Sequence, residues 1–216
     1  MLGAPGSGKG TLTSRLLKKV TQLSSISTGD LLRQEIGRKS SMGKVAEEYI
    51  KQGALLPDDF MAKFVTAELG TRNWLNNRAS FLLDGFPRTG NQAVQLDNEL
   101  LKHDSRINLV VELNVPPEVI LERIDNRWVH ASSGRVYNLS YNPPKVPFKD
   151  DITGEPLTKR SDDNPEIFKV RLDKYFEQLK SIKEFYQQQG VFSTVSGDTS
   201  DIIFPKLLQL VESKFT

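Results

Sequence analysis

The most informative motif of this chain is its glycine-rich segment, 3-GAPGSGKGT-11. Gly3, Gly8 and Lys9 stand at the spacing of a phosphate-binding loop, although the hydroxyl that usually follows the lysine comes one position later, at Thr11. In such a loop the glycines let consecutive backbone N–H groups turn toward one anion, and the helix that follows adds the positive end of its dipole. An ordinary glycine-rich turn is the alternative. The stretch therefore predicts an α/β fold in which the loop and Lys9 bind phosphate groups.

Downstream of the loop, strand-like and helical segments alternate. Short apolar runs at 80–84 and 107–115 have the length of buried parallel strands, and 22–27 and 191–196 are further strand candidates. Apolar residues repeat at helical spacing in 11–20, 30–38, 42–52, 165–189 and the C-terminal segment, and Pro57 opens a further helix. Residues 128–163 break this rhythm with alternating hydrophobicity and many turn residues. We therefore expect a parallel sheet flanked by helices, with a small antiparallel insertion.

Composition excludes several classes of protein. The 216 residues carry a net charge of +2, and acidic and basic residues are interspersed, so we expect no nucleic-acid partner that is bound through many phosphates. The sequence contains no apolar run long enough to form a transmembrane helix, and we expect no membrane partner. The absence of cysteine leaves no disulfide and no thiolate metal site.

A second signature, 82-LLDGFPR-88, follows one of the predicted strands. Asp84 at the end of a buried strand can hold Mg²⁺ through water beside a phosphate-binding loop. Considered alone, Asp84 would more often be a helix cap or a turn residue. Arg88, four residues later, can form a bidentate contact with phosphate and favours the phosphate-site interpretation.

With these motifs the chain resembles the adenylate kinase family, the nucleoside monophosphate kinases that have a long lid. The resemblance rests also on 27-STGDLLR-33, 127-RWVHASSGRVY-137, 142-NPPK-145 and 150-DDITGEPLTKR-160. In sequence, segments 134–147 and 195–205 are most similar to the mitochondrial GTP:AMP phosphotransferase branch of the family, particularly its fungal members. The resemblance implies a P-loop nucleoside monophosphate kinase fold with a core of 1–26, 57–125 and 164–216, an AMP cover of 27–56 and a lid of 126–163. It also implies a monomer in the mitochondrial matrix.

The same resemblance implies a set of site residues. The catalytic cations would be Lys9, Arg88, Arg127, Arg160 and Arg171. The donor nucleotide would contact Gly6, Ser7, Gly8, Lys9, Gly10, Thr11, Arg123, Arg127, Val136, Tyr137 and Thr199. AMP would contact Thr28, Arg33, Ala54, Leu55, Leu56, Gly85, Phe86, Arg88, Gln92, Arg160 and Arg171. Asp30 and Asp84 would hold Mg²⁺ through water.

Individual roles follow from the same match. Arg33 would bind the AMP phosphate, and the amide of Gln92 would pair with the adenine edge. Arg123 would stack on the donor base and Arg127 would clamp the donor phosphates, and their i, i+4 spacing predicts that both lie on one helical face. Phosphoryl transfer to an acceptor that is already anionic requires positioning and charge stabilisation by cations and Mg²⁺, so no nucleophilic side chain is expected.

His130, Ser133, Asp150 and Thr153 in the lid stand at the spacing at which four cysteines hold zinc in a knuckle. Hydroxyl groups are poor zinc ligands, so we expect these four side chains to form a hydrogen-bonded polar quartet without zinc.

Two questions stay open from the sequence. Only Met1 and Leu2 precede the first glycine, so the first, central strand of the sheet is expected to be missing. Either the chain derives from a longer one, or something else fills the gap. The donor is expected to be GTP, with ATP as the alternative. A degenerate kinase that binds nucleotides without turnover is a further possibility, whereas a GTPase switch is disfavoured because no Asn-Lys-x-Asp motif is found.

Overall fold

The computed structural model describes residues 1–160 and 162–215; positions 161 and 216, which belong to the predicted lid and core ranges, lie outside the described residues. The strands are β1 Leu2–Gly3, β2 Ser24–Ser27, β3 Phe81–Asp84, β4 Val110–Asn114, β5 Arg127–Val129, β6 Val136–Asn138 and β7 Phe192–Ser196. The helices are α1 Lys9–Lys19, α2 Thr28–Gly37, α3 Ser41–Lys51, α4 Asp58–Thr71, α5 Gly90–Leu101, α6 Pro117–Asp125, α7 Pro165–Gln188 and α8 Ser200–Phe215. The predicted strands and helices are confirmed, with shifts of a few residues at their ends.

The central sheet is parallel. β1, β4 and β7 pair in that order, and β2 pairs with β3. Met1 joins the two sets, because its nitrogen donates to Leu83 O at 2.7 Å and its carbonyl accepts from Gly85 N at 3.3 Å. The prediction that the first central strand is missing is therefore wrong. A strand of two residues lies between β3 and β4, where Leu2 aligns with Glu112.

The core lies on both sides of this sheet. One apolar cluster packs β4 against α1, α6 and α8, and another packs β2 and β3 against α2, α4 and α5. Leu2, which is 4% exposed, packs with Val110 and with Ile182 and Tyr186 of α7. Because apolar burial is the main favourable contribution to folding, these contacts fix β1 and hence the start of the glycine-rich loop.

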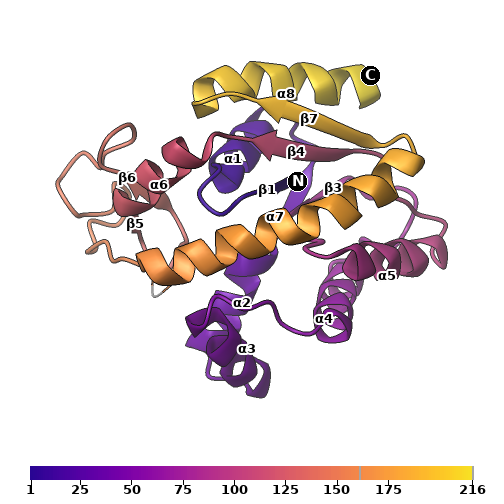
Figure 1. Ribbon diagram of the computed structural model, residues 1–216, viewed down its shortest axis with the longest axis horizontal. Helices are drawn as coiled ribbons and strands as arrows, with labels where there is room; N and C mark the ends of the chain where they lie inside the picture. The colour runs from indigo at the N-terminus through magenta and orange to yellow at the C-terminus, as the bar shows by residue number, and fades with distance from the viewer. Residues whose placement is uncertain (161, 216) are drawn as a thin grey trace.

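Two parts project from the core (Figure 1). Helices α2 and α3 lie at the bottom of the view, and the segment that contains β5 and β6 lies at the left. β5 and β6 pair antiparallel, and further bridges join Val129 to Thr158 and Lys149 to Pro156. The predicted antiparallel insertion is thus confirmed.

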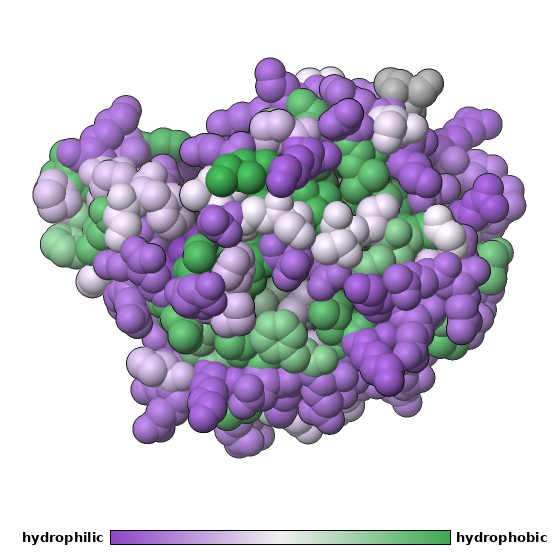
Figure 2. All heavy atoms as spheres, turned by 45° about the horizontal axis from the view of Figure 1, so that its top comes forward, coloured by the Kyte–Doolittle hydropathy of each residue, from purple (hydrophilic) through white to green (hydrophobic). Residues whose placement is uncertain are grey.

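Polar residues cover most of the face in Figure 2, and apolar atoms are exposed in its left part. The exposed apolar side chains of the insertion include Val146, Phe148 and Ile152. Among the described residues, no helix is both long and apolar enough to cross a membrane.

Candidate active site

The glycine-rich loop connects β1 to the N-terminus of α1. Gly6 and Gly8 have φ angles of 80° and 89°, in the left-handed region that favours glycine. A Cβ atom on Gly6 would lie 3.0 Å from Ile120 of α6, so the loop also needs glycine there for close packing. Backbone N–H groups of the first helical turn have no partner within a helix, and the turn that contains Lys9, Gly10 and Thr11 therefore provides donors for an anion.

Lys9 is folded back over this loop. Its Nζ donates to Gly3 O at 2.7 Å and to Ala4 O at 2.9 Å. Burial lowers the pKa of Lys9 to about 8, Asp84 opposes this shift, and Arg88 adds to it. The ammonium group thus lies close to the other predicted cations, and an additional anion would stabilise its charged form.

Five of the predicted arginines come together from α2, β5, α7 and two connecting segments. Burial, followed by repulsion from Arg171 and Arg33, lowers the pKa of Arg88 to about 10. Burial, followed by repulsion from Arg33 and Arg127, lowers the pKa of Arg160 to about 10. Arginine is normally far more basic, so the structure holds several cations close enough to repel one another. Such an arrangement is suited to a polyanionic ligand.

Aspartates partly neutralise this cluster. Arg127 forms a bidentate pair with Asp163, Arg171 bonds to Asp162 at 2.5 Å, and Arg33 pairs with Asp30. Asp162 and Asp163, the last two residues of the predicted lid segment 126–163, were not among the predicted site residues. Their side chains meet the arginines only in the folded protein.

The prediction that Arg123 and Arg127 share a helical face is wrong. α6 ends at Asp125, and Arg127 is the first residue of β5. Arg123 donates to Gly6 O at 3.4 Å and to Asp198 O, and the Tyr141 ring lies 5.7 Å from its Cζ. The two arginines therefore approach the loop from different elements.

The predicted AMP residues come from α2, the segment between α3 and α4, the loop after β3, α5, the segment before α7 and α7 itself. Thr28 is fully buried, and its hydroxyl donates to Gly85 O at 3.0 Å. Phe86 and Leu56 belong to one apolar cluster, while Ala54 and Leu55 are half-buried. Gln92 is 1% exposed; its Oε1 accepts from Arg88 N at 2.8 Å and its Nε2 donates to Asp58 at 2.9 Å.

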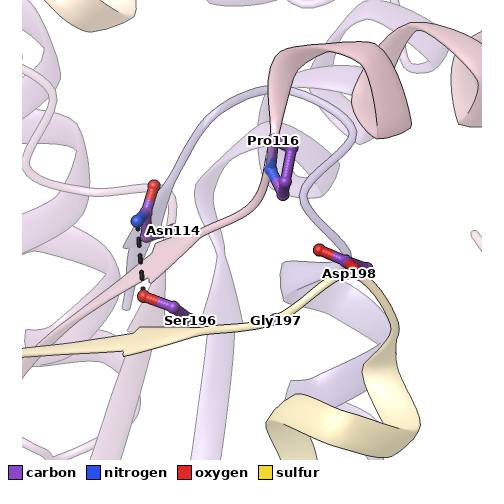
Figure 3. Close-up of a pocket in the computed structure, with 5 residues that line it drawn as sticks. All are labelled: Asn114, Pro116, Ser196, Gly197 and Asp198. Carbon is purple, nitrogen blue, oxygen red and sulfur yellow. Dashed lines mark hydrogen bonds between the residues drawn. The ribbon is translucent and has the colours of Figure 1, made fainter.

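The predicted donor residues come from the glycine-rich loop, the start of α1, α6, β5, β6 and the position before α8. An open pocket of roughly 420 Å³ lies at the ends of β4 and β7, and Figure 3 shows Asn114, Ser196 and Asp198 among the residues that line it. Thr199 comes next along the chain and accepts from Ile202 N at 3.2 Å as the cap of α8. Ser7 is fully buried, Val136 is 38% exposed, and the hydroxyl of Tyr137 points into the lid, where it donates to Asp150 at 2.9 Å. Any contact of Tyr137 with a donor nucleotide would therefore use its backbone.

The four predicted lid residues lie together. His130 Nδ1 lies 2.7 Å from Ser133 Oγ, its Nε2 lies 3.4 Å from Thr153 Oγ1, and Thr153 donates to Asp150 at 3.0 Å. Sequence reasoning missed Arg135, which forms a bidentate pair with Asp150 at 2.6 and 2.7 Å, and Glu155, at 2.5 Å from His130. In the part of the chain that the structure describes, no group of three or more His, Asp or Glu side chains is placed to hold a metal ion.

Asp30 and Asp84 fit a water-mediated Mg²⁺ site. Asp84 Oδ2 lies 3.9 Å from the position of a Cβ atom on Gly10, at the start of α1. Burial raises the pKa of the Asp84 carboxyl, and the charge of Asp30 acts in the same direction, so the two carboxylates are within electrostatic reach. An oxygen donor set of one or two carboxylates is what Mg²⁺ prefers while it keeps several waters.

The fold and the site define a P-loop protein that binds phosphorylated ligands. A sequence model described as "Adenylate kinase" matches residues 1–191. The chain is 62% identical to a protein from Saccharomyces cerevisiae named "GTP:AMP phosphotransferase, mitochondrial", across 100% of this chain and 92% of that protein. It is 44% identical to a Drosophila melanogaster protein of the same name (96% and 91% covered) and 39% identical to an "Adenylate kinase" of Malassezia globosa (93% and 78% covered).

The chain therefore belongs to the adenylate kinase family, whose members are nucleoside monophosphate kinases and generally use Mg²⁺ with their nucleotide substrates.

Proposed function

We propose that this protein transfers the terminal phosphoryl group of GTP reversibly to AMP, giving GDP and ADP. The observation that carries the proposal is the cation cluster around the glycine-rich loop, where Lys9, Arg88 and Arg160 all have lowered pKa values. GTP as the donor rests on the names of the relatives that are 62% and 44% identical. The same names support a mitochondrial location. We expect the protein to lie in the matrix and to be a monomer.

The chemistry requires charge stabilisation and no general base. The attacking group is an AMP phosphate oxygen, which is already anionic, and the transition state spreads negative charge over the transferred phosphoryl group. Lys9 and the loop N–H groups would hold the donor phosphates, and Arg33 and Arg88 would hold the AMP phosphate. Arg127, Arg160 and Arg171 would stabilise the charge between the two nucleotides. Mg²⁺, held through water by Asp30 and Asp84, would neutralise part of the donor phosphate charge.

Ion pairs within the protein prepare these arginines for phosphate. Asp162 and Asp163 hold Arg171 and Arg127 at the site. A guanidinium group forms the same bidentate contact with phosphate as with carboxylate, so nucleotide phosphates would compete with these aspartates for the arginines. Segments 27–56 and 126–163 would close over AMP and the donor respectively, which keeps water from the transferred phosphoryl group.

The test is product formation from AMP and Mg²⁺ with either GTP or ATP as donor, with GDP and ADP separated by chromatography. Faster transfer from GTP supports the proposal. Faster transfer from ATP would identify an ATP:AMP phosphotransferase and refute the choice of donor. Tight binding of a bisubstrate dinucleotide without turnover would identify a degenerate kinase, and loss of turnover on chelation of Mg²⁺ is expected for either donor.

A further inference from the structure

A hydrogen-bonded cluster outside the cation site is centred on Asp58, the first residue of α4. Its Oδ1 accepts from Thr89 Oγ1 at 2.9 Å and from Gln92 Nε2 at 2.9 Å, and its Oδ2 accepts from Asn91 Nδ2 at 3.1 Å. Thr89 in turn caps α5 by accepting from Gln92 N at 3.0 Å. One carboxylate of α4 thus connects three polar side chains at the start of α5.

This cluster determines which way the Gln92 amide faces. The oxygen and nitrogen of a glutamine amide have nearly the same shape, so the bonding partners decide the orientation. The backbone nitrogen of Arg88 can only donate, and it lies 2.8 Å from Gln92 Oε1. A carboxylate only accepts, and Asp58 lies 2.9 Å from Gln92 Nε2. If the amide turned over, its oxygen would face the Asp58 carboxylate and its NH₂ group would face the Arg88 N–H.

The orientation has a consequence for base recognition, provided that Gln92 reads the AMP base as the proposed function requires. A glutamine amide has two N–H donors and two lone pairs on its oxygen, and these two contacts use one of each. Because Gln92 is 1% exposed, a base must enter among the side chains that cover it. The remaining N–H and lone pair match N1 and the 6-amino group of adenine. Hypoxanthine presents the opposite order, a 6-oxo acceptor and an N1–H donor, and requires a reversed amide.

We propose that Asp58 is a positioning residue that makes the acceptor site selective for adenine over 6-oxopurines by locking the orientation of the Gln92 amide. Asp58 does not touch the reacting phosphates in this account. It acts through Gln92, and the inference rests on the proposed function of the acceptor site.

The test compares AMP with IMP as the acceptor, because the two bases differ only at the edge in question. Asp58→Asn is nearly isosteric, and an asparagine can present either its oxygen or its NH₂ group. Residue 58 then no longer excludes the reversed orientation of the Gln92 amide, and only the Arg88 N–H still opposes it. Loss of a hydrogen bond to a charged acceptor should lower the AMP:IMP ratio of kcat/KM roughly tenfold. Asp58→Ala should lower the same ratio, and the KM for GTP should not change in either variant.

Asp59→Asn is the matched control. Asp59 is exposed, is the next residue along α4, and accepts one bond from Gln95 Nε2 at 2.6 Å. Its AMP:IMP ratio should equal that of the wild type. Thermal melts of all variants identify any that do not fold. If Asp58→Ala does not fold, the AMP:IMP ratio of the isosteric Asp58→Asn variant decides the test.

Three outcomes overturn the inference or its basis. If Asp58→Asn lowers turnover of AMP and IMP by the same factor, Asp58 is only structural and the inference is wrong. The inference is also wrong if the AMP:IMP ratio of kcat/KM in Asp58→Asn equals that of the wild type. If the wild type does not phosphorylate AMP, the proposed function itself fails, whatever the variants show.

Discussion

Substituting Gly43 by alanine should damage the AMP side of the site selectively. Gly43 lies in the first turn of α3, where its nitrogen donates to Ser40 Oγ at 2.9 Å. A Cβ atom at this position would lie 2.1 Å from Glu35 O, 2.4 Å from Glu35 C and 2.7 Å from Ile36 N. All three are backbone atoms of α2, so no side chain can turn aside to make room.

The magnitude follows from this overlap. Ordinary van der Waals contact between a Cβ atom and a neighbouring heavy atom begins near 3.4 Å, whereas the new Cβ would lie 2.1 Å from Glu35 O. Helix α3 must therefore move away from α2 by about 1.3 Å. Overpacking of this kind costs roughly 1–3 kcal/mol, and the better helix propensity of alanine offsets up to about 1 kcal/mol. A net loss of about 1–2 kcal/mol in the free energy of unfolding lowers the Tm of a chain of this length by about 2–8 °C.

The functional readout separates the AMP cover from the rest of the enzyme. α2 carries Thr28 and Arg33, so its displacement should raise the KM for AMP and leave the KM for GTP near the wild-type value. The matched control is Gly37→Ala, because a Cβ atom on Gly37 has no neighbour within 4 Å; its Tm should equal or exceed that of the wild type. A Gly43→Ala protein that melts at the wild-type temperature with an unchanged KM for AMP would refute this reasoning.

Two further predictions concern the loop lysine and the lid. Because burial lowers the pKa of Lys9 to about 8, kcat/KM for GTP should fall as the pH rises above about 8. The folding contribution of Lys9 has the opposite sign: the charged form costs stability below pH 8, and this cost is relieved between pH 8 and 10.5. If kcat/KM for GTP stays constant up to pH 9 while thermal melts show that the protein is folded, the predicted fall in kcat/KM is wrong. Asp150→Ala removes the carboxylate that accepts hydrogen bonds from Arg135, Tyr137 and Thr153. Hydrogen exchange of the backbone amides across 127–160 should therefore become faster, and the KM for GTP should rise. Unchanged exchange would show that the hydrogen bonds of Asp150 do not stabilise this segment.

Local features of the sequence were sufficient to predict most of the fold. The parallel strands are short apolar runs, and the helices begin and end at residues with local conformational preferences, such as Pro57 and Gly190. The glycine-rich loop could be predicted because its geometry depends on a few neighbouring residues, three of which are glycines with positive φ angles. Arg123 and Arg127 show the limit of this approach, because their spacing suits a helix and only the start of β5 in the folded chain separates them.

Residues close together in the chain specify the phosphate-binding loop and the order of strands and helices, and the motifs supply the types of charged residue that the chemistry requires. Which of those charges meet depends on how the folded chain packs. The pairs Arg127–Asp163 and Arg171–Asp162, the bonds from Asp58 to Thr89 and Gln92, and the contacts of Met1 with Leu83 and Gly85 join different elements. Helix and strand preferences act over a few residues, whereas these contacts depend on how packed elements orient side chains that are distant along the chain.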